Sequence, residues 1–141
     1  MFKISVTPQI RDIDALRHVN NNAVADWFEV GRNDIFKIFT PTLEMDYEHW
    51  ELILVRTEID YLGQMFFNFD VEIRTYILHI GNSSLVIGHE AWQDGEIKAK
   101  GKCVVVNFDF IKQEKKTIRD EVRKQLEEHL IDEKDIGKIF N

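Results

Sequence analysis

Hydrophobic and polar positions recur with two different periods along this chain, and the longest pattern has the period of a helix. Downstream of three asparagines, apolar or small residues return every three or four positions, until the pair Thr40-Pro41 ends the pattern. The members of this stripe are Val24, Trp27, Phe28, Gly31, Ile35, Ile38 and Phe39. The pattern predicts one helix over about 21–39, and the breadth of the stripe indicates that a sheet surrounds it.

Residues with a period of two predict strands on both sides of this helix. The first strand, over 2–10, is short and edge-like because it contains Pro8. After the helix, the alternation predicts strands over 53–61, 69–77, 85–93 and 97–105, with a turn at Gly81-Asn82. One face of the 53–61 strand carries Ile53, Val55, Thr57, Ile59 and Tyr61. One face of the last strand carries Ala99, Gly101 and Cys103, and the other carries Lys98, Lys100 and Lys102.

Asp94-Gly95 indicates a hairpin with two alternative registers. A two-residue loop pairs Lys100 with His89, whereas a three-residue loop over 94–96 pairs Gly101 with His89 and Ala99 with Ala91. We favour the three-residue loop because it keeps small and apolar residues together. The small side chains on that strand would let the helix lie close to it.

A final short helix is predicted after Phe110, where the chain turns polar. Thr117 can cap it, and apolar residues four apart line one side: Ile118, Val122, Leu126 and Leu130. No repeat, linker or low-complexity segment interrupts the chain. We therefore expect a single domain over 1–141, of the α+β class, in which one sheet wraps around one long helix.

Composition and charge exclude several classes of function. The chain of 141 residues carries a net charge of −7, which argues against nucleic acid as the main partner. The N-terminal apolar segment is too short for a signal peptide, and no apolar run is long enough for a membrane span. The single cysteine, Cys103, excludes an intramolecular disulfide and suits a reducing compartment, so we expect a cytoplasmic protein.

One segment contains residues that could catalyse a reaction. Asp12 and Asp14 lie a few residues before the helix that begins among the asparagines. The first N–H groups of a helix can bind an oxyanion, and a nearby carboxylate can drive an attack. Both aspartates can equally be loop residues that make local turn hydrogen bonds.

The motifs in this segment resemble those of a known family. Asp12-Ile-Asp14, His18-Val-Asn20-Asn21 and Trp27-Phe-Glu29-Val-Gly-Arg32 are similar to the hotdog-fold thioesterases of the 4-hydroxybenzoyl-CoA and acyl-CoA type. Acyl-carrier-protein (ACP) thioesterases have a similar pattern. The resemblance continues, through weaker strand motifs, over nearly the whole chain: Ile59-Asp-Tyr-Leu, Gly81-Asn-Ser-Ser and Ala99-Lys-Gly101.

This resemblance implies a hotdog fold, with an antiparallel sheet of about five strands around one long central helix. It also implies that Asp14 is the catalytic carboxylate and that a backbone N–H within 19–23 binds the thioester oxygen. The family usually forms dimers whose sheets join edge to edge, so we expect a homodimer or homotetramer, without a cofactor. Arg17 departs from the family pattern, in which glycine usually precedes the histidine, and so does the segment 64–69, where proline and acidic residues are usual.

Further residues are candidates for the substrate site. His18, Val19, Asn20 and Asn21 lie at or before the helix start, and Glu29 lies further along the helix. His18 can polarise the carbonyl or order the loop, and Glu29 can be a second polar group or pair with Arg32.

Other motifs have ordinary explanations. The lysines on the last strand can meet the phosphates of coenzyme A or form a solvated strand face. Cys103 is expected to be a small core residue. The other histidines lack metal-ligand spacing, so no metal site is expected: His49, His79, His89 and His129.

The sequence thus predicts hydrolysis of an acyl-CoA to a carboxylate and a thiol, with Asp14 as nucleophile or general base. An acyl-ACP thioesterase, a hotdog hydratase or dehydratase, and a non-catalytic module that binds acyl thioesters are the alternatives.

Overall fold

The computed structural model describes residues 1–132 and residue 135. The expectation of one domain over 1–141 therefore extends to residues that lie outside this description. The elements in chain order are β1 (Phe2–Val6), the short 3₁₀ helix η1 (Ile10–Asp12), α1 (Asn21–Gly31), α2 (Asn33–Phe39), β2 (Leu52–Tyr61), β3 (Val71–Ile80), β4 (Ser84–Gln93), β5 (Glu96–Asp109), β6 (Glu114–Lys115) and α3 (Asp120–Glu127).

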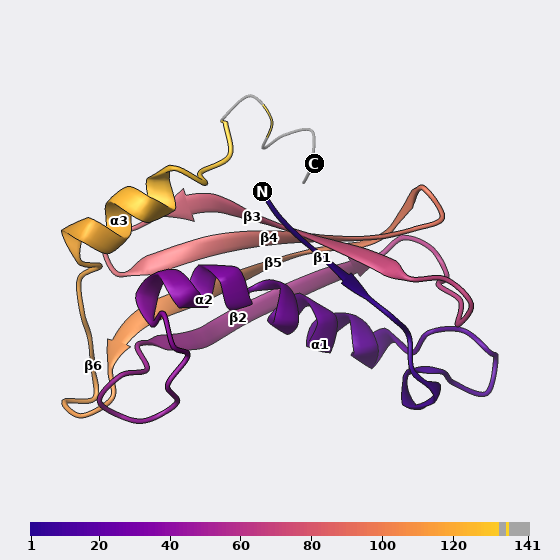
Figure 1. Ribbon diagram of the computed structural model, residues 1–141, viewed down its shortest axis with the longest axis horizontal. Helices are drawn as coiled ribbons and strands as arrows, with labels where there is room; N and C mark the ends of the chain where they lie inside the picture. The colour runs from indigo at the N-terminus through magenta and orange to yellow at the C-terminus, as the bar shows by residue number, and fades with distance from the viewer. Residues whose placement is uncertain (133–134, 136–141) are drawn as a thin grey trace.

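The strands form one antiparallel sheet in the order β1-β3-β4-β5-β2, and the two-residue strand β6 pairs with β5. Figure 1 shows this sheet curling around α1 and α2, which lie along one of its faces. This curled sheet with helices against it is the α+β arrangement of the hotdog fold. β1 and β2 are the edges of the sheet among the described residues, so no further described strand pairs with their outer sides.

The predicted long helix is two helices. α1 ends at Gly31 and α2 begins at Asn33, with Arg32 between them at φ −81° and ψ −8°. The Arg32 N–H donates to the carbonyl of Glu29, three residues back, which tightens the last turn of α1. A side chain on Gly31 would approach Thr75 Oγ1 to 2.8 Å, so glycine lets the chain lie against β3 at this break.

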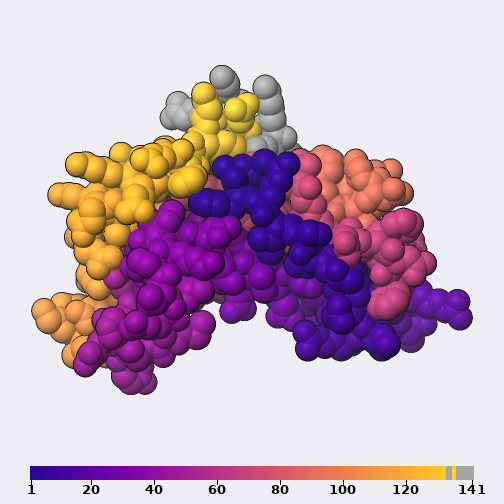
Figure 2. Space-filling model, in the orientation of Figure 1, coloured from indigo at the N-terminus to yellow at the C-terminus, as the bar shows by residue number. Residues whose placement is uncertain are grey.

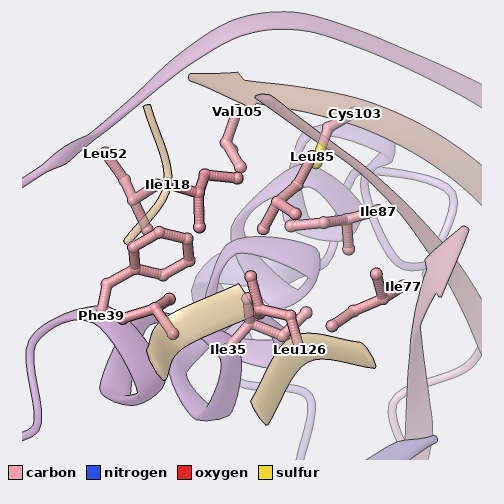
Figure 3. Packing of buried hydrophobic residues seen from close by; sticks show 11 residues of the cluster. Ile35, Phe39, Leu52, Ile77, Leu85, Ile87, Cys103, Val105, Ile118 and Leu126 are labelled. Atoms are coloured by element: carbon pink, nitrogen blue, oxygen red, sulfur yellow. The ribbon is translucent and has the colours of Figure 1, made fainter. Parts of the chain in front are cut away.

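The apolar stripe itself is confirmed across both helices. Six of its seven members are buried: Val24, Trp27, Phe28, Gly31, Ile35 and Phe39. Figure 3 shows how Ile35 and Phe39 of α2 meet side chains from β3, β4 and β5 and from α3, including Ile77, Ile87 and Leu126. A second cluster surrounds α1 and includes Trp27, Phe28, Ile73 and Ala99.

The favoured pairing of the β4–β5 hairpin is confirmed, but its predicted loop is wrong. Ala91 pairs with Ala99 and His89 with Gly101, as predicted. The loop has two residues, Asp94 and Gly95, both with positive φ, and a bulge between Ala91 and Trp92 restores the register. The bulge thus produces the pairing register that was expected from a three-residue loop.

A second bulge changes the predicted faces of β2. The register with β5 shifts between Leu54 and Arg56, so Val55 is the extra residue. Leu54, rather than Ile53, consequently shares a face with Thr57, Ile59 and Tyr61.

Three element boundaries also differ from those predicted. β1 stops at Val6, two residues before the buried Pro8. β3 begins at Val71, which leaves Phe69 outside the strand and half exposed. α3 begins at Asp120 with Arg119 rather than Thr117 as its N-cap residue.

The apolar side of α3 is buried as expected at Ile118, Val122 and Leu126, but Leu130 lies beyond the helix and is exposed. Arg119 also ties α3 to α2, because its Nη2 donates to the carbonyl of Phe39 at 3.2 Å. α3 therefore closes one end of the core.

Candidate active site

The loop between β1 and α1 carries the candidate catalytic residues and folds back on itself. Ile13 and Val19 form an antiparallel bridge, and the Asp14 N–H donates to the carbonyl of His18 at 3.0 Å. Figure 2 shows this loop projecting from one end of the molecule, opposite the segment that follows α2. The fold-back brings Asp14 to the same end of the molecule as the start of α1.

Asp12 orders this loop. Its carboxylate accepts a hydrogen bond from the Gln9 N–H at 2.8 Å, and its carbonyl accepts one from the Asn20 N–H at 2.6 Å. The loop role considered for Asp12 from the sequence agrees with these contacts.

Asp14 is exposed, and only one of its carboxylate oxygens is engaged. Oδ1 accepts from the Leu16 N–H at 2.9 Å, while Oδ2 accepts no hydrogen bond from any residue that the structure describes. One oxygen thus fixes the side chain on its turn, and the other is available to a substrate or a water molecule.

The backbone conformation of Arg17 explains why glycine is usual at this position. Its φ is +65°, in the left-handed region, which costs a residue with a Cβ roughly 1–2 kcal/mol. The backbone of the turn keeps this conformation because the Arg17 N–H donates to the Asp14 carbonyl at 3.1 Å. The loop therefore adopts the glycine-type turn without the glycine.

The His18 ring packs against Phe66. His18 forms a bridge with Phe66, and the two rings meet edge to face with centroids 5.4 Å apart. No residue in the described part of the chain hydrogen-bonds to the His18 ring. His18 and Phe66 both line an open hollow of about 600 Å³ beside the loop, together with Leu16 and Phe67.

The start of α1 leaves one backbone N–H free. Asn20 is the N-cap: its Oδ1 accepts from the Asn22 N–H at 2.9 Å, and its carbonyl accepts from the Ala23 N–H. The N–H of Val19 donates to the carbonyl of Met65 at 2.8 Å, and that of Asn20 is taken by Asp12. Of the five amides from 19 to 23, only that of Asn21 donates to no acceptor among the described residues.

Comparison with known proteins now places this arrangement in a family. The sequence model of the thioesterase-like superfamily matches residues 8–126. The chain belongs to the thioesterase-like superfamily. The resemblance to hotdog-fold thioesterases is thereby confirmed.

Solved structures of this superfamily align over nearly the whole chain. A predicted thioesterase from Bacillus stearothermophilus is 42% identical, with a TM-score of 0.89, and the match covers 92% of this chain and 96% of that one. A thioesterase from Thermus thermophilus, complexed with coenzyme A and Zn, is 26% identical, with a TM-score of 0.79 and coverage of 89% and 96%. No protein of curated function matches the sequence significantly.

A protein from Staphylococcus aureus, SAV2348, was solved in complex with CoA and shares the fold, with a TM-score of 0.82, at 12% identity. The match covers 93% of this chain and 86% of that one.

The remaining predicted site residue, Glu29, lies two turns along α1 from the helix start and is exposed. It forms no ion pair with Arg32, which is 5% exposed and points inward. The pairing considered for these two residues is therefore not found. Glu29 instead lines a small cavity between α1 and β2, together with Arg32.

Sequence reasoning missed Tyr61 and the buried polar residues below α1. The Tyr61 hydroxyl donates to the Asn21 carbonyl at 3.4 Å, which ties the end of β2 to the helix start. Arg32 and His89 are buried in contact with each other. Their positions carried a signal, because Arg32 is spaced four residues from Phe28 in the apolar stripe and His89 alternates with Ile87 and Ala91 on the inner face of β4.

Within the described residues, one group has the proximity of metal ligands. Glu44, Asp46 and His49 lie together on the exposed segment between α2 and β2. His49 Nδ1 is 3.0 Å from a Glu44 oxygen and 2.8 Å from an Asp46 oxygen. The hydrogen bond to Asp46 raises the pKa of His49, and ion pairing accounts for the group. The lysines of β5 lie on the sheet face away from α1, where Lys98 pairs with Glu96 at 2.7 Å.

Proposed function

We propose that the protein hydrolyses acyl-CoA thioesters, with Asp14 as the catalytic carboxylate and the Asn21 N–H as the oxyanion donor. The observation that carries this proposal is the one amide at the start of α1 that has no acceptor among the described residues, next to the loop that holds the half-engaged Asp14 carboxylate. Coenzyme A is favoured over a carrier protein because a 26% identical relative of almost full coverage binds it.

The chemistry requires little more than these two groups. The thioester oxygen accepts the Asn21 N–H, and the positive end of the α1 dipole stabilises the charge that develops there. In one route, Oδ2 of Asp14 attacks the carbonyl carbon, the thiolate leaves, and water then hydrolyses the resulting anhydride. In the other, Oδ2 removes a proton from a water molecule that attacks the carbonyl carbon, and the thiolate leaves from the tetrahedral intermediate. The thiolate needs no strong acid in either route. His18 and Phe66 line the open hollow beside the loop that carries Asp14.

The active unit is proposed to be a homodimer that joins through β2. This edge strand has ten residues and exposes Leu54, Val55 and Tyr61 to between 47% and 57%, which is unusual for an unprotected edge. A second copy that pairs along β2 would cover them. Light scattering should give about twice 16.7 kDa, and Val55→Lys should shift the mass toward the monomer. A wild-type mass of one chain at micromolar concentration would contradict the dimer.

Thiol release from a panel of acyl-CoAs and from an acyl-ACP tests the function. Hydrolysis of acyl-CoA at a higher kcat/KM than acyl-ACP supports the proposal. Tight binding without release would instead identify a binding module, and water addition to an enoyl-CoA would identify a hydratase. Cys103, reduced and buried, fits the expected cytoplasmic location, which stays a prediction.

No helix in the described part of the chain has the length and apolar character needed to cross a membrane.

A further inference from the structure

A buried arginine, Arg32, lies at the junction of α1 and α2. Arg32 is 5% exposed, and no carboxylate oxygen within the described residues comes within 4.0 Å of its guanidinium. Its Nη1 lies 3.3 Å from His89 Nε2, but its Nε–H is buried and has no hydrogen-bond partner among the residues that the structure describes. Burying a cation is costly, and a free N–H on it adds to that cost, so this group needs a functional explanation.

The surroundings hold this arginine in place. Because a guanidinium can only donate, His89 Nε2 must be the acceptor, and the ring proton is on Nδ1, which donates to Thr75 Oγ1 at 3.1 Å. Burial and the adjacent Arg32 charge keep the pKa of His89 well below its usual value, so the ring stays neutral and able to accept. Phe28 stacks on the same ring at 4.8 Å. The Arg32 side chain is therefore fixed before any ligand arrives.

Arg32 also lines a cavity of about 110 Å³ between α1 and β2. The helix side of this cavity includes Ala25, Phe28 and Glu29, which follow Asn21 at spacings of four, seven and eight residues. These spacings place Asn21 and the cavity on one face of α1. From Asn21 to Arg32 the helix rises roughly 16 Å.

β2 forms the opposite wall along the same direction. Tyr61 contacts Asn21 at one end, and Ile59, Thr57 and Leu54 follow on the same strand face toward the cavity. An acyl group whose carbonyl lies at the Asn21 N–H would thus extend along this face of α1 toward Arg32.

We propose that the cavity receives the distal part of the acyl group and that the Arg32 guanidinium, which lines it, donates to a neutral carbonyl or hydroxyl oxygen on it. This assignment rests on the proposed thioesterase function and names its substrate class as oxygenated acyl-CoAs. A neutral oxygen fits better than a carboxylate because three acidic residues line the cavity against two basic ones: Asp26, Glu29 and Glu58 against Arg32 and Lys102. Arg32 is a specificity residue in this account, since it touches the acyl group away from the reacting atoms.

Three acyl-CoAs of matched chain length test the proposal: one with a plain alkyl end, one with a distal hydroxyl or oxo group, and one with a distal carboxylate. A hydrogen bond to a charged donor predicts that kcat/KM is about tenfold to a hundredfold higher for the hydroxyl or oxo chain than for the alkyl chain. The Arg32→Met variant should bring this ratio close to one. Arg123→Met is the matched control, because Arg123 donates to the carbonyls of Gly81 and Asn82, away from the cavity, and should keep the ratio.

Ala25→Leu provides a second test if Arg32→Met does not fold. Ala25 is exposed on α1 and lines the cavity, so leucine there should lower kcat/KM progressively as the acyl chain lengthens. Equal kcat/KM for the alkyl and oxygenated chains in the wild type, or a loss in Ala25→Leu that is independent of chain length, overturns the proposal. A preference for the carboxylate overturns the assignment to a neutral oxygen. No turnover of any acyl-CoA overturns the thioesterase function and this proposal with it.

Discussion

Replacing Asn21 by proline removes the proposed oxyanion donor and almost nothing else. Asn21 is the first residue of α1, a position where proline is favoured because its missing N–H has no partner inside the helix. The preceding residue, Asn20, has φ −65° and ψ 139°, which is the conformation that a following proline requires. The Asn21 carbonyl, which accepts from Tyr61, is kept. We therefore expect the free energy of unfolding to change by less than about 1 kcal/mol.

The catalytic effect should be much larger. Removing one donor from an oxyanion hole typically costs about 10²–10³ in kcat, or roughly 3–4 kcal/mol of barrier. Asn21→Ala is the control, since it deletes the side chain but keeps the N–H, and it should lose less than about tenfold. Steady-state thiol release measures both variants, with chemical denaturation as the check on folding. If Asn21→Pro were folded and as active as Asn21→Ala, the Asn21 N–H would not be the donor.

Three further outcomes follow from packing, backbone strain and charge. A Cβ on Gly101 would lie 2.9 Å from the backbone oxygen of Glu58, so Gly101→Ala should lower the free energy of unfolding by about 1–2 kcal/mol in urea melts. Gly63→Ala, which meets only the flexible end of Lys98, should not, and equal melts would refute the close approach. Arg17→Gly should raise the free energy of unfolding by about 0.5–1 kcal/mol by relieving the positive φ, and a loss of stability would show that the turn is not strained. Burial first and Arg32 second depress the pKa of His89 in the folded state. The contribution of neutral His89 to the free energy of unfolding is therefore present above the unfolded pKa of about 6.5 and is lost as the pH falls below that value. A pH series of melts should show a smaller acid loss in His89→Gln, and the same loss as wild type would contradict this.

The sequence predicted the stripe of the helices and the pairing of β4 with β5 because both depend on local periodicity. It did not predict the break at Arg32, because Asn33 and Asp34 are compatible with a continuous helix and the break depends on the contact between Gly31 and β3. The bulge at Val55 was also invisible, since Ile53 and Leu54 are both apolar and either could face inward. Contacts between distant segments decide both features.

The candidate site likewise depends partly on local sequence and partly on contacts between distant segments. The motif around Asp14 pointed to the helix start, but it left the donor undecided over 19–23. Only the tertiary contacts of Val19 with Met65 and of Asn20 with Asp12 leave Asn21 as the free amide. The sequence pattern thus indicated the helix start as the candidate site, and the contacts of the folded loop identify the Asn21 N–H as the available donor.

The most direct test of the thioesterase assignment is the turnover of the Asp14→Asn variant on the best acyl-CoA. Asparagine keeps the acceptor for the Leu16 N–H, so the turn and the fold should survive, while the charge needed for attack is lost. Asp12→Asn is the control in the same loop, since it keeps the acceptor for the Gln9 N–H. We predict that Asp14→Asn lowers kcat by about a hundredfold or more, roughly 3 kcal/mol of barrier, and that Asp12→Asn does not. A folded Asp14→Asn variant with kcat within about threefold of wild type would contradict the assignment.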